Sequence, residues 1–168
     1  MAIVRKDKMS AGYHDGLESV VVVNGATPIS VKNGLFVTVK NEFYKATDFF
    51  DGEALIAELA GADDVAEEVM LIDGKHYEYD EKIKKDDFKY RAGEVARAYK
   101  LTDGDIITLT EDLLTDVPTG LKDVFAVTAN GKLGKTELDT AKISFVVIEN
   151  SGNELTQRDN AWAFRVVR

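Results

Sequence analysis

The sequence predicts a mainly β protein, built as a small antiparallel barrel or sandwich with one or two short helical insertions and an extended N-terminal arm. Three observations carry this prediction. Pairs in which Asn, Asp or Ser precedes Gly recur along the chain, and such pairs mark tight turns. Short runs rich in β-branched and aromatic residues lie between these pairs, whereas runs with helical periodicity are few. Short, regularly spaced strands of this kind are typical of small barrels and sandwiches.

The runs between the turn pairs are the predicted strands. They comprise residues 19–23, 35–40, 69–72, 96–101, 105–110, 124–129, 143–149 and 161–167. Residues 106–110 and 162–166 alternate, which predicts one buried and one solvated face. Residues 20–23 and 145–148 are apolar at every position, which indicates strands covered on both faces or buried by a partner.

Three segments favour helix. Residues 51–59 combine an acidic first turn with apolar Leu55 and Leu59 at helical spacing. Residues 80–89 would place Ile83 and Phe88 on an inward face. A single helical turn is expected at residues 111–114.

The chain is expected to form one domain, since 168 residues are the usual length of a single core. Residues 1–18 are predicted to be an N-terminal arm, ordered only if another segment holds it. Residues 19–168 are predicted to be one β-rich domain, within which a division into 19–72 and 73–168 stays open.

Composition excludes several functional classes. The chain has no cysteine, so disulfides, thiolate nucleophiles and cysteine-bound metals are excluded. Its net charge of −9 repels phosphate backbones, and we expect no nucleic-acid partner. The longest apolar run, residues 20–23, is too short to cross a bilayer, so no membrane partner is expected either. No apolar run follows the first basic residues, which predicts folding in a cytoplasm.

No pattern for catalysis, a cofactor or a metal is present, and we expect a protein that is not an enzyme. His14 stands beside Asp15, but one imidazole and one carboxylate are too few for a zinc site. Asp103 and Asp105 flank a glycine and are best explained as residues of a hairpin turn, in which Asp103 caps the bend. The sequence from Gly131 to Thr136 ends in Gly-Lys-Thr, but it lacks the glycine spacing of a phosphate loop and is interpreted as a hairpin connection.

Residues 79–110 carry the most informative pattern. It consists of Tyr79, Asp80, Glu81 and Lys82, then Asp87-Phe88 and Gly93, then Ala96-Arg97, Tyr99 and Leu101, and finally Gly104-Asp105-Ile106. This pattern resembles small virion proteins of tailed bacteriophages, mainly of Gram-positive hosts, whose genes commonly lie beside that of the major capsid protein. The resemblance covers these residues well and most of the chain loosely. Residues 51–68 and 112–123 depart from it.

The resemblance implies a head decoration, or cement, protein on the outer capsid surface of the virion, made in the host cytoplasm. Its expected partner is the major capsid protein, and self-association on the capsid stays open. Such a protein stabilises the head against the pressure of packaged DNA and needs no cofactor. The expected capsid contacts are apolar and basic residues of the arm: Ile3, Val4, Arg5, Lys6, Lys8, Met9 and Tyr13.

Two other functions remain open at this point. A carbohydrate-binding β-barrel module would need an exposed aromatic cluster larger than the one that Trp162, Tyr77 and Tyr79 could supply. A hydrolase would use the acidic pair Asp103 and Asp105. Arg97 is expected to form a buried ion pair with Glu94 or Asp105 within the fold, in preference to contacting a partner.

Overall fold

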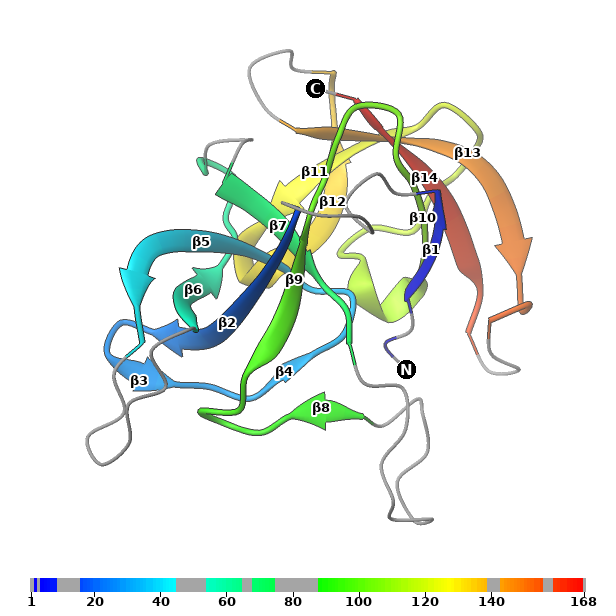
Figure 1. Ribbon diagram of the computed structural model, residues 1–168. Coiled ribbons are helices and arrows are strands. Elements are labelled where there is room, and N and C mark those ends of the chain that lie inside the picture. The colour runs from blue at the N-terminus through cyan, green and yellow to red at the C-terminus, as the bar shows by residue number, and fades with distance from the viewer. Residues whose placement is uncertain are drawn as a thin grey trace.

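The computed structural model describes residues 2, 4–8, 16–44, 54–64, 68–74, 88–138, 143–155 and 159–167. Within these residues 57% lie in strands and there is no α-helix, which confirms the predicted mainly β class. The strands form two six-stranded sheets and one two-stranded sheet (Figure 1). No helix in this part of the chain has the length and apolar character needed to cross a membrane.

The first sheet closes on itself into a small barrel. Its strands bond in the order β3-β2-β6-β5-β7-β9, and β9 pairs back with β2. The β2–β6 pair is parallel and the other pairs are antiparallel. The bounds are Leu17–Asn24 for β2, Thr27–Pro28 for β3, Phe36–Phe43 for β5, Leu55–Leu59 for β6, Val69–Ile72 for β7 and Ala96–Lys100 for β9.

Successive side chains along a strand point to opposite faces of the sheet, and those of one face fill the barrel. Val20 and Val22 of β2 belong to one buried cluster, whereas Val21 and Val23 pack in a separate cluster on the other face. All four are buried, as predicted for a strand covered on both sides. A short sheet of β4 (Val31–Lys32) and β8 (Lys89–Tyr90) adds Phe88 and Tyr90 to the barrel cluster.

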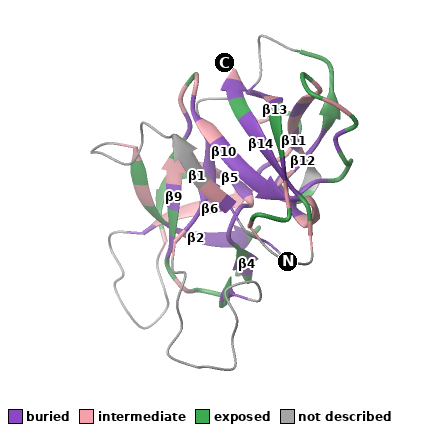
Figure 2. Ribbon diagram, turned by 90° about the vertical axis from the view of Figure 1, so that its right-hand side faces the viewer, coloured by how far each residue is buried: buried purple, intermediate pink, exposed green. Residues whose placement is uncertain are grey.

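The second sheet is antiparallel throughout and bonds in the order β1-β10-β14-β13-β11-β12. Its buried face packs against the barrel, and Figure 2 shows buried residues along β14, β10 and β2. The bounds are Val4–Lys8 for β1, Ile106–Thr110 for β10, Val124–Thr128 for β11, Lys132–Thr136 for β12, Ser144–Gly152 for β13 and Ala161–Val167 for β14.

One hydrophobic core joins the two sheets. Its largest cluster contains Phe36, Val69 and Leu71 from the barrel together with residues of the second sheet. The turn between β11 and β12, the 3₁₀ helix η5 (Ala129–Gly131), also reaches the barrel, because the Gly131 amide donates to the Ala60 carbonyl at 3.0 Å. The chain passes from barrel to second sheet at residues 101–105, between β9 and β10.

All eight predicted strands are present as β2, β5, β7, β9, β10, β11, β13 and β14. Residues 145–148 are not covered on both faces within this chain, because Phe145 and Val147 are buried while Ile148 is 38% exposed, and their burial by a partner stays a prediction. The single turn predicted at residues 111–114 is the 3₁₀ helix η4 (Glu111–Leu113).

The helix predicted over residues 51–59 is wrong where the structure describes it. Residues 51–53 lie outside the described residues, and Leu55–Leu59 is strand β6. This strand pairs with β2 on one side and with β5 on the other, and these two ladders override the helical preference of its sequence. Most of the helix expected at residues 80–89 lies outside the described residues, and its end, Lys89, belongs to β8.

The expected N-terminal arm is tied down where it is described. Strand β1 pairs with β10, with Val4 opposite Leu109 and Arg5 opposite Thr108. Val4 is 5% exposed and belongs to the main core cluster. The strand β10 is therefore the segment that orders this part of the arm.

Candidate functional site

The residues expected to contact a capsid divide into three groups. Ile3, Met9 and Tyr13 lie outside the described residues. Lys6 and Lys8 are part of β1. Val4 and Arg5 contact the protein itself: Val4 is buried, and the Arg5 guanidinium lies 3.6 Å from the Glu154 carboxylate and donates to the Thr108 hydroxyl at 3.4 Å.

A second candidate surface, which the sequence did not predict, is the loop of residues 115–123 that precedes β11. It begins along the edge of β12, where the Thr115 amide donates to the Leu133 carbonyl at 2.7 Å. The Lys135 amide then donates to the Asp116 carboxylate at 3.1 Å. Gly134 makes this close approach feasible, since a β-carbon there would run into Thr115 and Asp116. The loop thus covers the edge strand of the second sheet.

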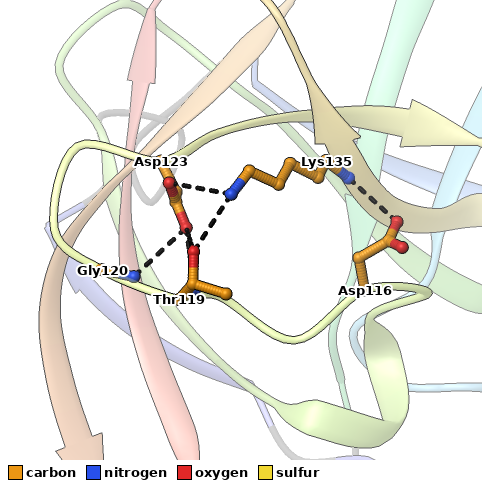
Figure 3. A network of polar contacts seen from close by, with 5 residues as sticks. All are labelled: Asp116, Thr119, Gly120, Asp123 and Lys135. Carbon is orange, nitrogen blue, oxygen red and sulfur yellow. Dashed lines mark hydrogen bonds and ion pairs between the residues drawn. The ribbon is translucent and has the colours of Figure 1, made fainter.

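The Asp123 carboxylate holds the far end of the loop. It accepts hydrogen bonds from the Thr119 amide at 2.8 Å, the Thr119 hydroxyl at 2.9 Å and the Gly120 amide at 3.2 Å. The Lys135 ammonium lies 3.1 Å from both Asp123 and the Thr119 hydroxyl (Figure 3). These contacts lower the pKa of Asp123 from 3.8 to about 2. The largest cause is the hydrogen bond from the Thr119 amide, and the next are those from the Lys135 ammonium and the Thr119 hydroxyl.

The end of the loop also joins the ladder of β13. The Lys122 amide donates to the Val147 carbonyl at 2.8 Å, and the Val147 amide donates to the Asp123 carbonyl at 2.9 Å. To meet β13 in this way, Lys122 adopts a left-handed backbone with φ +71°. This conformation is uncommon for a residue other than glycine.

Exposed apolar residues occur on this loop and on the segments bonded to it. Seven large hydrophobic residues are exposed in the part of the chain that the structure describes, and four of them lie on the loop or on the segments bonded to it. Val117 is 55% exposed and Leu121 is 63% exposed on the loop itself. Leu138 follows β12 at 56% exposed, and Ile148 follows Val147 at 38% exposed. The arrangement is suited to binding a surface, because it offers apolar area on a fixed backbone.

The alternative sites are not assembled by the described residues. Trp162 is 8% exposed, and its indole N–H donates to Glu111 at 3.2 Å, so it offers no stacking platform for a sugar. Tyr77 and Tyr79 lie outside the described residues. Asp105 is buried and accepts the Thr102 amide at 2.8 Å, so these residues do form a turn. The predicted hairpin is wrong, because the turn joins β9 to β10, which belong to different sheets.

The prediction of a buried ion pair for Arg97 is wrong. Arg97 is exposed on β9, so it forms no buried ion pair with either predicted partner. Its carbonyl accepts the Asp73 amide at 3.1 Å, which continues the pairing of β7 with β9.

Two hollows flank the turn between β2 and β3 in the barrel. The smaller, of about 260 Å³, contains Glu58, whose carboxylate is paired with Lys40 at 2.8 Å. The larger, of about 560 Å³, is lined by Phe43, Tyr44 and Ile56. No group of three or more His, Asp or Glu side chains suited to a metal ion occurs among the described residues.

The chain has no significant match to a protein-family model, to a curated protein or to a solved structure. The resemblance in residues 79–110 can still be compared with the fold. Of its residues, Ala96 lies in the barrel core, and Leu101 lies in the core shared by the two sheets. Gly93 and Gly104 adopt φ of +81° and +85° at the turns before and after β9. The described part of the pattern therefore builds the junction between barrel and second sheet.

Proposed function

We propose that this protein is a virion structural protein, a decoration or cement protein that binds the outer surface of the assembled head of a tailed bacteriophage. The observation that carries the proposal is the resemblance in residues 79–110. Most of its described positions are scaffold positions, among them the buried Ala96, the turn glycines Gly93 and Gly104 and the capping Asp105, whereas Arg97 is exposed. A pattern of this kind supports a shared scaffold, and the function is inferred from the family that the pattern resembles.

The architecture suits a clamp on a preformed shell. A cement protein must resist deformation while it bridges neighbouring subunits, and here the barrel and the second sheet share one core. Two contacts made by one rigid body raise the effective concentration of each contact, so that weak contacts together bind firmly. A protein that binds only the expanded shell stabilises that state by mass action.

Strand β1 supplies one proposed contact. Lys6 and Lys8 lie on a strand at the edge of the second sheet, together with Arg5. Ile3, Met9 and Tyr13 adjoin this strand in the sequence and complete the proposed contact. Val4 is buried and holds β1 to the body, so it is not part of the proposed surface. The net charge of −9 would keep decorated particles dispersed.

The test is co-sedimentation of the purified protein with bare, expanded capsids of a phage that carries it and with unexpanded capsids. We expect saturable binding at a fixed ratio to the capsid subunit, and capsids that withstand higher temperature when decorated. Deleting β1 would uncover β10, so the arm is better tested by replacing Arg5, Lys6 and Lys8 with alanine. Absence of binding to either form of the capsid would overturn the proposal.

A further inference from the structure

We infer that the loop of residues 115–123 is a second docking surface, which seats Val117 and Leu121 in an apolar depression on the outer face of a capsid subunit. This inference rests on the proposed function and adds to it. It assigns the contact to the second sheet and places it on a segment that departs from the family resemblance.

The loop is held in place by contacts within the protein itself. Asp123 accepts the amides of Thr119 and Gly120, and the Lys135 ammonium contacts both Asp123 and Thr119. At the other end of the loop, Asp116 accepts the Lys135 amide of the edge strand β12. Immobilising a flexible loop on binding reduces affinity, because the loop loses conformational entropy. A loop fixed by its own contacts avoids that loss, and Figure 3 shows how these contacts close the loop from both ends.

The fixed loop exposes two apolar side chains to solvent. Val117 and Leu121 are both more than half exposed, and in the sequence they come before and after Thr119, which the Asp123 carboxylate binds. Water disfavours such side chains, and each would be stabilised by burial against a partner. Leu138 and Ile148 extend the apolar character along the bonded strands.

The backbone of Lys122 has an uncommon conformation. Its φ of +71° is unfavourable for a side chain of this kind, and backbone conformations of this type are concentrated at functional sites. Because Lys122 directly follows Leu121, its conformation fixes the direction in which the chain leaves the most exposed apolar residue. The polar network and the left-handed residue are independent observations on one segment.

The partner is best assigned as the shell and not as a second copy of this chain. Val117, Leu121, Leu138 and Ile148 together expose far less than the roughly 800 Å² per partner that a stable pair of proteins buries. Two copies would also bring together two bodies of charge −9. Around the loop, Asp116 and Asp123 balance Lys122 and Lys135, while the exposed Glu137 and Glu149 flank Leu138 and Ile148 and make the wider surface acidic. A small contact becomes effective on a repeating shell, where it works together with β1.

The hollow around Phe43 is a weaker candidate. It is apolar, and Phe43 is 57% exposed, but nothing in the structure shows what covers it. It therefore supplies a matched control.

The experiment compares three proteins in co-sedimentation with expanded capsids over a range of protein concentrations. They are the natural sequence, a loop variant with Val117→Ser and Leu121→Ser, and a control with Phe43→Ser. All three changes affect exposed side chains, so thermal unfolding of the free proteins should be nearly unchanged. We expect the loop variant to bind about tenfold more weakly or worse, and the control to bind as the natural sequence does.

The outcomes separate this inference from the proposed function. If the natural sequence does not bind capsids, the proposed function fails and the inference fails with it. If the natural sequence binds and the loop variant binds equally well, only the inference is overturned. If sedimentation velocity of the free protein shows a dimer that the loop variant loses, the loop is a self-association surface and the inference is also overturned.

Discussion

Phe36 of the barrel meets Phe145 of the second sheet edge to face, with the ring centroids 5.0 Å apart and the planes inclined at 61°. Both rings are fully buried. Phe36 stands on β5 and Phe145 on β13, so the pair fixes one sheet against the other. An edge-to-face pair contributes about 0.5–1.5 kcal/mol beyond the burial of its area.

Replacing Phe36 and Phe145 by leucine, singly and together, tests this contact. Each single change should destabilise the protein, and the double change should cost roughly 0.5–1.5 kcal/mol less than the sum. Denaturant unfolding measures all three. The control pair Phe43→Leu with Phe145→Leu should be additive, because Phe43 is exposed on the barrel surface. Additivity for Phe36 and Phe145 as well would contradict a coupling between the sheets.

Gly131 is expected to tolerate no side chain. It has φ +67°, and an added β-carbon would collide with the Phe36 carbonyl oxygen. We expect Gly131→Ala to cost roughly 3 kcal/mol or more. Gly25 is the matched control, since its φ is +61° but open space surrounds its missing β-carbon. Gly25→Ala should cost about 1 kcal/mol, for the backbone alone. Equal losses of stability for the two variants in denaturant unfolding would contradict a close contact between Gly131 and the Phe36 carbonyl of β5.

The Asp123 carboxylate should make stability depend on pH in the acid range. Its pKa is about 2 in the folded protein, below the ordinary 3.8, so its contribution is complete above pH 3.8. The contribution should fall as pH drops from 3.8 toward 2. The stability difference between the natural protein and Asp123→Asn, followed by thermal unfolding from pH 6 to pH 2, should be constant at first and then shrink. A difference that stays constant across this range would contradict the lowered pKa.

Lys122→Asn should stabilise the protein. Asparagine adopts the left-handed backbone of this position more readily than lysine does, and we expect a gain of about 1 kcal/mol or less. Lys132→Asn is a suitable control, because the same replacement there meets an extended backbone with φ −103°. Thermal unfolding of both variants gives the comparison. A loss at Lys122 that matches the loss at Lys132 would argue against strain in the loop.

Val4 should matter more to stability than its neighbour Arg5. Val4→Ala removes buried methyl groups and should cost roughly 1.5–2.5 kcal/mol. Arg5→Ala breaks an exposed ion pair with Glu154 and should cost less than about 1 kcal/mol. Denaturant unfolding ranks the two. If Val4→Ala has no effect, β1 is not part of the stable core.

The sequence predicts the longer strands well and the remaining elements poorly. Most of the eight confirmed runs are rich in β-branched or aromatic residues, as in Ala161–Val167, although Ala96–Lys100 has only Tyr99. The two-residue strands β3, β4 and β8 are too short to produce a periodic pattern. Strand β12 contains two lysines and a glycine, because it is the sheet edge that residues 115–116 cover.

Strand β6 and the 115–123 loop depend on contacts that no local pattern encodes. Leu55–Leu59 has helix-forming residues, and only the neighbours β2 and β5 make it a strand. The contact of Asp123 with Lys135 depends on the register between β11 and β12, which sets Phe125 opposite Lys135. The sequence Pro118-Thr119-Gly120 is typical of a turn, but such a sequence does not predict which side chains the turn leaves exposed.

The pairing of β1 with β10 constrains the order in which this chain can fold. Arg5 and Thr108 are 103 residues apart, so β1 leaves the ribosome long before its partner does. At about 5–20 residues per second, the delay is roughly 5–20 s. All strands of the barrel lie between them in the sequence, so the barrel can close while β1 waits. Nascent chains should therefore pass through a stage in which the barrel resists proteolysis and Val4 is still accessible to solvent.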